Sequence, residues 1–91
     1  MKNVLRRLKK YRGFNSFDPP YLVKLIKSNA KYIKNVEWDG DPNDTDTVYD
    51  LVYIEAKNTE LARTKCLLIG YMAGADEVCF EHKNIVRIWF D

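Results

Sequence analysis

The sequence has few of the residues that mark membrane-spanning, secreted or metal-binding proteins. Its 91 residues include two cysteines, Cys66 and Cys79, and one histidine, His82. Two cysteines do not make a disulfide framework, and their spacing fits no zinc site, so we expect both to be small core residues. No apolar run approaches the roughly 20 residues of a membrane span, and no apolar segment follows the basic N-terminus as in a signal peptide. We therefore expect a cytoplasmic protein without membrane contact, metal or cofactor.

The composition indicates a globular protein. Charged residues make up 31% of the chain and hydrophobic residues 46%, which is unlike a disordered segment. No internal repeat or low-complexity stretch occurs. A chain of this length buries roughly two-thirds of its unfolded surface, which is enough for one modest core. The sequence therefore predicts a single domain over residues 1–91.

Acidic residues are nearly missing from the first third of the chain. Residues 1–34 contain ten Lys and Arg but a single acid, Asp18, which gives a charge of +9. Residues 35–91 contain five basic and twelve acidic residues, which gives −7. Solubility would tolerate Glu as well as Lys, so two consecutive basic segments without acids point to a polyanionic partner or to electrostatic docking.

Two amphipathic helices are predicted in the basic part. In residues 2–12, Val4, Leu5, Leu8 and Tyr11 recur at helical spacing. A second helix is expected over residues 19–34, with Asp18 as its N-cap and Pro19 at its first position. Four of its lysines are spaced three, four and three apart, so we expect them to form one row: Lys24, Lys27, Lys31 and Lys34.

The acidic part reads as two hairpins separated by a helix. Residues 35–39 and 47–56 have strand patterns around a turn-forming loop, and residues 77–82 and 85–90 form a second pair. Between them, a helix is expected from residue 59 to about 75, with Asn58 as its N-cap. Its second half is apolar nearly all round. This predicts burial on several sides, with Gly70 and Gly74 allowing close approach.

The element order ααββαββ defines the expected fold class. It predicts an α+β fold with two N-terminal amphipathic helices, a β-hairpin, a crossover helix and a second β-hairpin. The crossover helix should make the second and third strands parallel. The four-stranded sheet is therefore expected to be mixed.

Two patterns have part of the spacing of a metal or catalytic site. Asp39, Asp41 and Asn43 have the spacing of the ligands in a calcium-binding loop. However, Asp44 occupies the position at which that loop needs glycine. Asp and Asn are also common in turns, so these residues need no metal to explain them. The triplet Glu55-Ala56-Lys57 resembles the (D/E)xK half-motif of metal-dependent nucleases. A second acid on the same face is missing, so a nuclease-like domain using Glu55 and Lys57 is only a remote third hypothesis.

The remaining reactive residues do not indicate an enzyme. His82 and Cys79 face opposite sides of a regular strand, so they do not make a nucleophile pair. Tyr49 and Tyr53 are expected to share a strand face with Leu51. Burial in the core, the common use of aromatic rings in a small protein, is favoured over exposure, in which the rings would stack on unpaired bases.

The sequence therefore leaves two main hypotheses. The first is a non-enzymatic nucleic-acid-binding module, RNA ahead of DNA, whose basic helices contact phosphates. Its binding residues would be Arg6, Lys9, Lys10, Lys24, Lys27, Lys31 and Lys34. The alternative is a protein-binding inhibitor or adaptor that docks on an oppositely charged protein surface, or self-associates as a homo-oligomer, by charge complementarity.

Overall fold

The computed structural model describes all 91 residues as an α+β fold of three helices and one four-stranded sheet. The element order is the predicted one. The elements are α1 (Lys2–Lys10), α2 (Pro19–Ser28), the short 3-10 helix η1 (Ala30–Tyr32), β1 (Ile33–Glu37), β2 (Leu51–Ala56), α3 (Glu60–Met72), β3 (Glu77–His82) and β4 (Ile85–Trp89).

The sheet has the strand order β1-β2-β4-β3, and every neighbouring pair is antiparallel. The strands β2 and β3 do run in the same direction, as the crossover helix predicted, but β4 lies between them. The expected mixed sheet is therefore wrong. The physical reason is that the second hairpin places its more apolar strand in the centre: Val86 and Ile88 of β4 are fully buried, whereas β3 is largely exposed.

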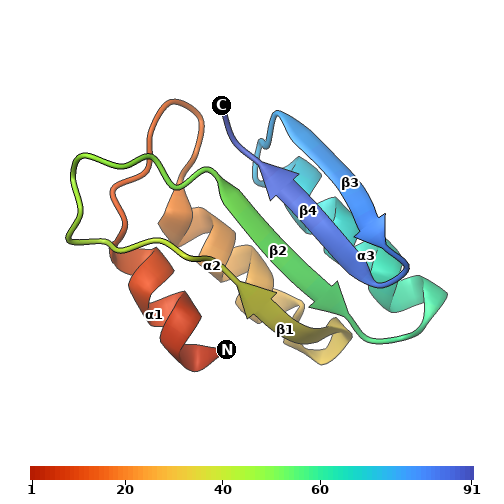
Figure 1. The fold of residues 1–91 in the computed structure, drawn as a ribbon. Helices are drawn as coiled ribbons and strands as arrows, with labels where there is room; N and C mark the ends of the chain where they lie inside the picture. The colour runs from red at the N-terminus through yellow and green to blue at the C-terminus, as the bar shows by residue number, and fades with distance from the viewer.

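The helices α2 and α3 cover one face of the sheet, and α1 packs beside α2 at the β1 edge (Figure 1). Along β2, the even-numbered Val52 and Ile54 are fully buried beneath them, and the odd-numbered Leu51, Tyr53 and Glu55 are only half-buried. This alternation is the period-two pattern of a strand with one covered face. The other face, which we call the open face, has no helix over it.

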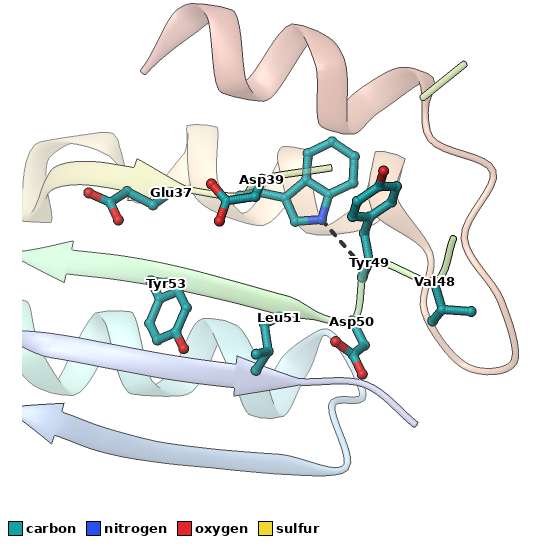
Figure 2. A pocket seen from close by; sticks show the side chains of 8 residues that line it. Glu37, Asp39, Val48, Tyr49, Asp50, Leu51 and Tyr53 are labelled. Carbon is teal, nitrogen blue, oxygen red and sulfur yellow. Dashed lines mark hydrogen bonds between the residues drawn. The ribbon is translucent and has the colours of Figure 1, made fainter. Parts of the chain in front are cut away.

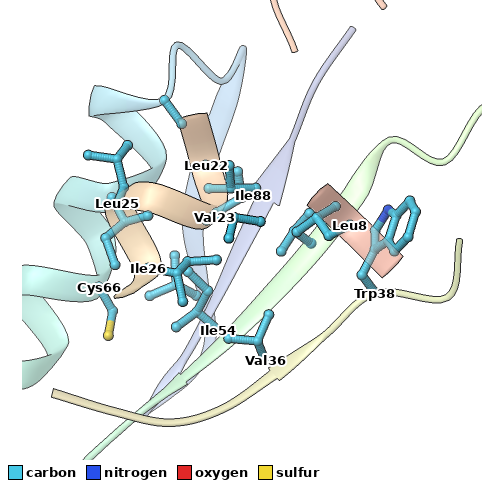
Figure 3. Close-up of a cluster of buried hydrophobic side chains, with 14 of the residues drawn as sticks. Leu8, Leu22, Val23, Leu25, Ile26, Val36, Trp38, Ile54, Cys66 and Ile88 are labelled. Atoms are coloured by element: carbon cyan, nitrogen blue, oxygen red, sulfur yellow. The ribbon is translucent and has the colours of Figure 1, made fainter. Parts of the chain in front are cut away.

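The core lies between the helices and the covered face. It contains 21 buried hydrophobic residues and no buried polar or charged residue. Leu22 and Ile26 of α2 lie close to Val36, Ile54 and Ile88 of three different strands (Figure 3). At one end, the rings of Phe17 and Phe90 stack with centroids 4.0 Å apart, which joins the α1–α2 linker to the last residues of the chain.

The predicted N-cap of α2 is confirmed, whereas the N-cap of α3 lies one residue after the predicted one. The carboxylate of Asp18 accepts a hydrogen bond from the backbone N–H of Tyr21 at 3.2 Å. For α3 the cap is Thr59, not Asn58, since the Thr59 hydroxyl accepts from the N–H of Ala62 at 3.1 Å. The Asn58 side chain instead accepts a hydrogen bond from Arg63.

The second helix is shorter than predicted. It ends at Ser28, where the Asn29 side chain donates a hydrogen bond to the carbonyl of Leu25 at 2.8 Å. Ile33 and the residues after it belong to β1, in which Ile33 pairs with Ala56. The predicted single row of four lysines is therefore wrong: Lys24 and Lys27 lie on α2, Lys31 on η1 and Lys34 on β1.

Burial of α3 is also more limited than predicted. Only one side packs on the sheet, and Leu61, Leu68, Tyr71 and Met72 are exposed. The close approach at Gly70 is confirmed, because a Cβ atom there would lie 2.8 Å from both γ-methyl groups of Val78. Gly74 has no atom within 4 Å of such a Cβ and instead supplies a positive φ of 78° after the helix.

Arg7 connects α1 to the segment after β1. Its guanidinium donates hydrogen bonds to the carbonyl oxygens of Gly40 at 2.6 Å and Trp38 at 3.2 Å, and it lies 5.7 Å from the Trp38 ring centroid. Arg7 is half-buried, whereas the adjacent Arg6 is exposed. Successive residues of a helix point about 100° apart, so one arginine faces the fold and the other faces solvent.

Replacing Arg7→Gln should lower the free energy of unfolding by about 1–2 kcal/mol, because two charge-assisted hydrogen bonds to partly buried carbonyls are lost. The matched variant Arg6→Gln should change it by less than about 0.5 kcal/mol. Urea denaturation followed by Trp fluorescence measures both values. Equal stabilities for the two variants would contradict the structural role of Arg7.

Candidate nucleic-acid interface

Basic side chains from α1 and α2 line one continuous groove between the two helices. It consists of two shallow hollows of about 420 and 400 Å³ that share Lys9 and Lys27. On α1 the basic residues recur at positions i, i+4 and i+7, so they follow one side of the helix. We call this surface the basic groove, and its charged residues are Lys2, Arg6, Lys9, Lys24 and Lys27.

No acidic residue lines the basic groove. The two ion pairs of the molecule lie elsewhere: Lys34 with Glu55 at 3.8 Å, and Arg87 with Glu77 at 2.6 Å. The five cations of the groove therefore have no internal counter-charge. Like charges gathered in a concave surface raise the local positive potential and attract anions.

The structure brings together four of the seven residues predicted to bind nucleic acid: Arg6, Lys9, Lys24 and Lys27. Lys10 lies outside the groove, Lys31 lies 5.1 Å from the ring centroid of Tyr32, and Lys34 pairs with Glu55. Sequence reasoning left out Lys2, although its spacing from Arg6 and Lys9 already placed it on the same side of the helix.

A network of hydrogen bonds organises the loop between β1 and β2. The Asp44 carboxylate accepts from the backbone N–H of Asp46 at 2.9 Å, from that of Thr47 at 3.3 Å and from the Tyr49 hydroxyl at 2.8 Å. Because these bonds favour the ionised form, they lower the pKa of Asp44 to about 2, from an ordinary value of 3.8.

Tyr49 and Tyr53 do not share a face, contrary to the sequence expectation. Tyr49 lies before β2 and turns toward α1, where its ring meets Tyr11 and Trp38 with centroids 6.0 and 5.8 Å away. The indole N–H of Trp38 donates to the Tyr49 carbonyl at 3.4 Å (Figure 2). Tyr53 is half-buried, but it lies on the open face, so the expected place in the core is wrong for this ring.

The open face carries two adjoining hollows that share Glu37 and Tyr53. Figure 2 shows Glu37, Asp39 and Asp50 around the first, and the second adds Glu55, Glu81 and His82. This surface is acidic, in contrast to the basic groove. The charge division seen along the sequence is thus also a division between two surfaces of the fold.

Neither metal-binding hypothesis finds a converging set of ligands. Nowhere do three His, Cys, Asp or Glu side chains come together in a way that could hold an ion. In the acidic loop, the Asp41 carboxylate accepts from the backbone N–H of Asn43 at 2.9 Å, as in an ordinary turn. Glu55 pairs with Lys34, and Lys57 is exposed beyond the end of β2.

The two cysteines occupy different environments. Cys66 is buried in α3, and burial raises the pKa of its thiol to about 11. This agrees with its expected role as a small core residue. Cys79 is exposed on β3, contrary to the same expectation, because it lies opposite Arg87 on the open face of the sheet, which no helix covers.

Comparisons of the chain with protein families, curated proteins and solved structures find no match. None of its helices is long and apolar enough to cross a bilayer. The functional argument therefore depends on the geometry of the chain's own residues.

The carboxyl of Asp44 should titrate near pH 2, because its charged form accepts hydrogen bonds that unfolding breaks. A depressed pKa stabilises the folded loop above about pH 4 and loses that effect as pH falls toward 2. Carboxyl NMR titration measures the midpoint. Asp46→Asn, whose side chain accepts none of these bonds, should leave it unchanged; a midpoint near 4 would contradict the network.

Proposed function

We propose that the protein is a small, non-enzymatic module that binds nucleic acid through the basic groove. The observation that carries this proposal is the convergence of five cations from two helices on one groove without an acid or an internal ion pair. Lysine and arginine in such a groove neutralise phosphates and release condensed counterions. The binding is therefore to the sugar-phosphate backbone.

RNA is the favoured form. The groove is shallow and lined by basic side chains together with Pro20, Val23, Ser28 and Leu5, so it offers no set of side chains arranged to read base edges in a major groove. A surface of this kind recognises shape and backbone, which is the common mode of RNA recognition outside base-specific modules.

Binding should weaken steeply with salt. Neutralising about five phosphates predicts a slope near −4 for the logarithm of affinity against the logarithm of salt concentration. Fluorescence-anisotropy titrations with a short RNA, a single-stranded DNA and a duplex DNA at several salt concentrations measure this slope. A shallow slope, or no binding at low salt, would remove the basic groove as a phosphate site.

The charge reversal Lys9→Glu/Lys27→Glu tests the groove itself, because these residues line both hollows and are exposed. It should lower affinity for RNA by about tenfold or more without altering the circular dichroism spectrum. Lys57→Glu/Lys83→Glu produces the same change in net charge on exposed residues outside the groove. Equal losses in the two double variants would show that net charge, not the groove, carries binding.

A second candidate function rests on the acidic hollows of the open face. An acidic surface opposite a basic groove favours docking on a charged protein surface, or head-to-tail association of copies. The protein would then be an inhibitor or adaptor. Salt-sensitive association in light scattering, without retention of nucleic acid, would support this second function over the first.

A further inference from the structure

Exposed apolar side chains are concentrated on α3 and on the edge strand β3. Of eight large hydrophobic residues exposed on the molecule, five lie on α3 or β3. Tyr71 is 59% exposed and Phe80 43%. Apolar side chains gathered in one region of the surface mark an interaction site more often than scattered ones do.

The side of α3 that faces β3 can be identified from its contacts. The Arg63 side chain donates to the Asn84 side chain in the β3–β4 turn, and Gly70 packs on Val78. Leu67 and Tyr71 follow Arg63 by four and eight residues, so they continue the same side of the helix. We call Leu67, Tyr71, Val78 and Phe80 the edge patch.

The register of the sheet shows which backbone groups of β3 are free. The backbone N–H of Phe90 donates to Asp50, and that of Ala56 donates to Asn84, so even-numbered residues of β4 direct their backbone groups toward β2. Odd-numbered residues of β4 therefore bond to β3, with Arg87 opposite Cys79. The N–H and C=O groups of Val78 and Phe80 consequently point away from the sheet, where no segment follows β3 (Figure 1).

We propose that two copies of the chain associate through β3 as an antiparallel pair, with a twofold axis at Cys79. This register places Val78 opposite Phe80 of the second copy and uses both free backbone positions. Such a contact is self-complementary and closes as a dimer. It joins the two sheets into one of eight strands and brings the edge patches together across the seam.

The dimensions predict a modest affinity. A six-residue strand and a thirteen-residue helix are each roughly 20 Å long. Together they present a face of roughly 20 by 20 Å, or about 400 Å² per copy, which is smaller than the standard specific interface and fits a weak contact. Glu81 would also lie opposite Glu77 of the second copy, although Arg87 already neutralises Glu77. We therefore expect a dimer that dissociates on dilution.

Analytical ultracentrifugation over low micromolar to submillimolar concentrations tests the dimer. The mass should rise to that of two chains and should persist in high salt, unlike association by charge. Tyr71→Lys and Phe80→Lys should each raise the dissociation constant at least tenfold. Val48→Lys, which changes an equally exposed apolar residue in the β1–β2 loop, should not change it. A single-chain mass at every concentration would overturn the proposal.

Cross-linking tests the register. Facing residues in a non-hydrogen-bonded antiparallel pair have Cα atoms about 4.5 Å apart, which a disulfide can span. Oxidation with diamide should link two Cys79 side chains in the native protein, and Phe80→Lys should slow this at least tenfold. A dimer in the ultracentrifuge without this disulfide would exclude the axis at Cys79. Neither experiment contains nucleic acid, so a negative result would rule out the dimer without affecting the proposal that the basic groove binds nucleic acid.

Discussion

The packing of the helices around one face of the sheet, with α1 beside α2 at the β1 edge, is the constraint on which the rest of the structure depends. Each helix must direct its apolar side toward the same layer, so its polar residues can only point outward or toward a neighbouring helix. In α1 and α2 every charged residue is a cation. One-sided packing thus converts a charge bias along the chain into one basic groove, and it leaves the opposite sheet face to the acidic strands.

The order of the elements could be predicted because each has a clear periodicity or cap, as at Asp18. The end of α2 could not. Ile33 continues the helical spacing of Leu22, Leu25 and Ile26, but it also begins the alternation that β1 needs, and only its pairing with Ala56 decides between them. The strand order also depends on contacts between distant residues, since the sequence allows either strand of the β3–β4 hairpin to lie beside β2. The burial of Val86 and Ile88 places β4 there.

The candidate site shows the same limit. Counting charges identified the basic region, but it could not separate Arg6, which lines the groove, from Arg7, which holds the carbonyl oxygens of Gly40 and Trp38. The two differ by one helical step. A helix that extends to residue 34 would place Lys34 on the binding surface, but Lys34 lies on β1 and pairs with Glu55.

The position of the ion pairs bears on the groove's counter-charge. Both pairs, Lys34 with Glu55 and Arg87 with Glu77, involve strands of the sheet, and neither includes a residue of α1 or α2. The acids of the fold therefore do not neutralise its basic helices. Cations three or four positions apart repel each other by a few tenths of a kcal/mol per pair. A chain that concentrates them in one groove gains nothing in stability from doing so, which is why we propose a polyanionic partner as the source of the compensating charge.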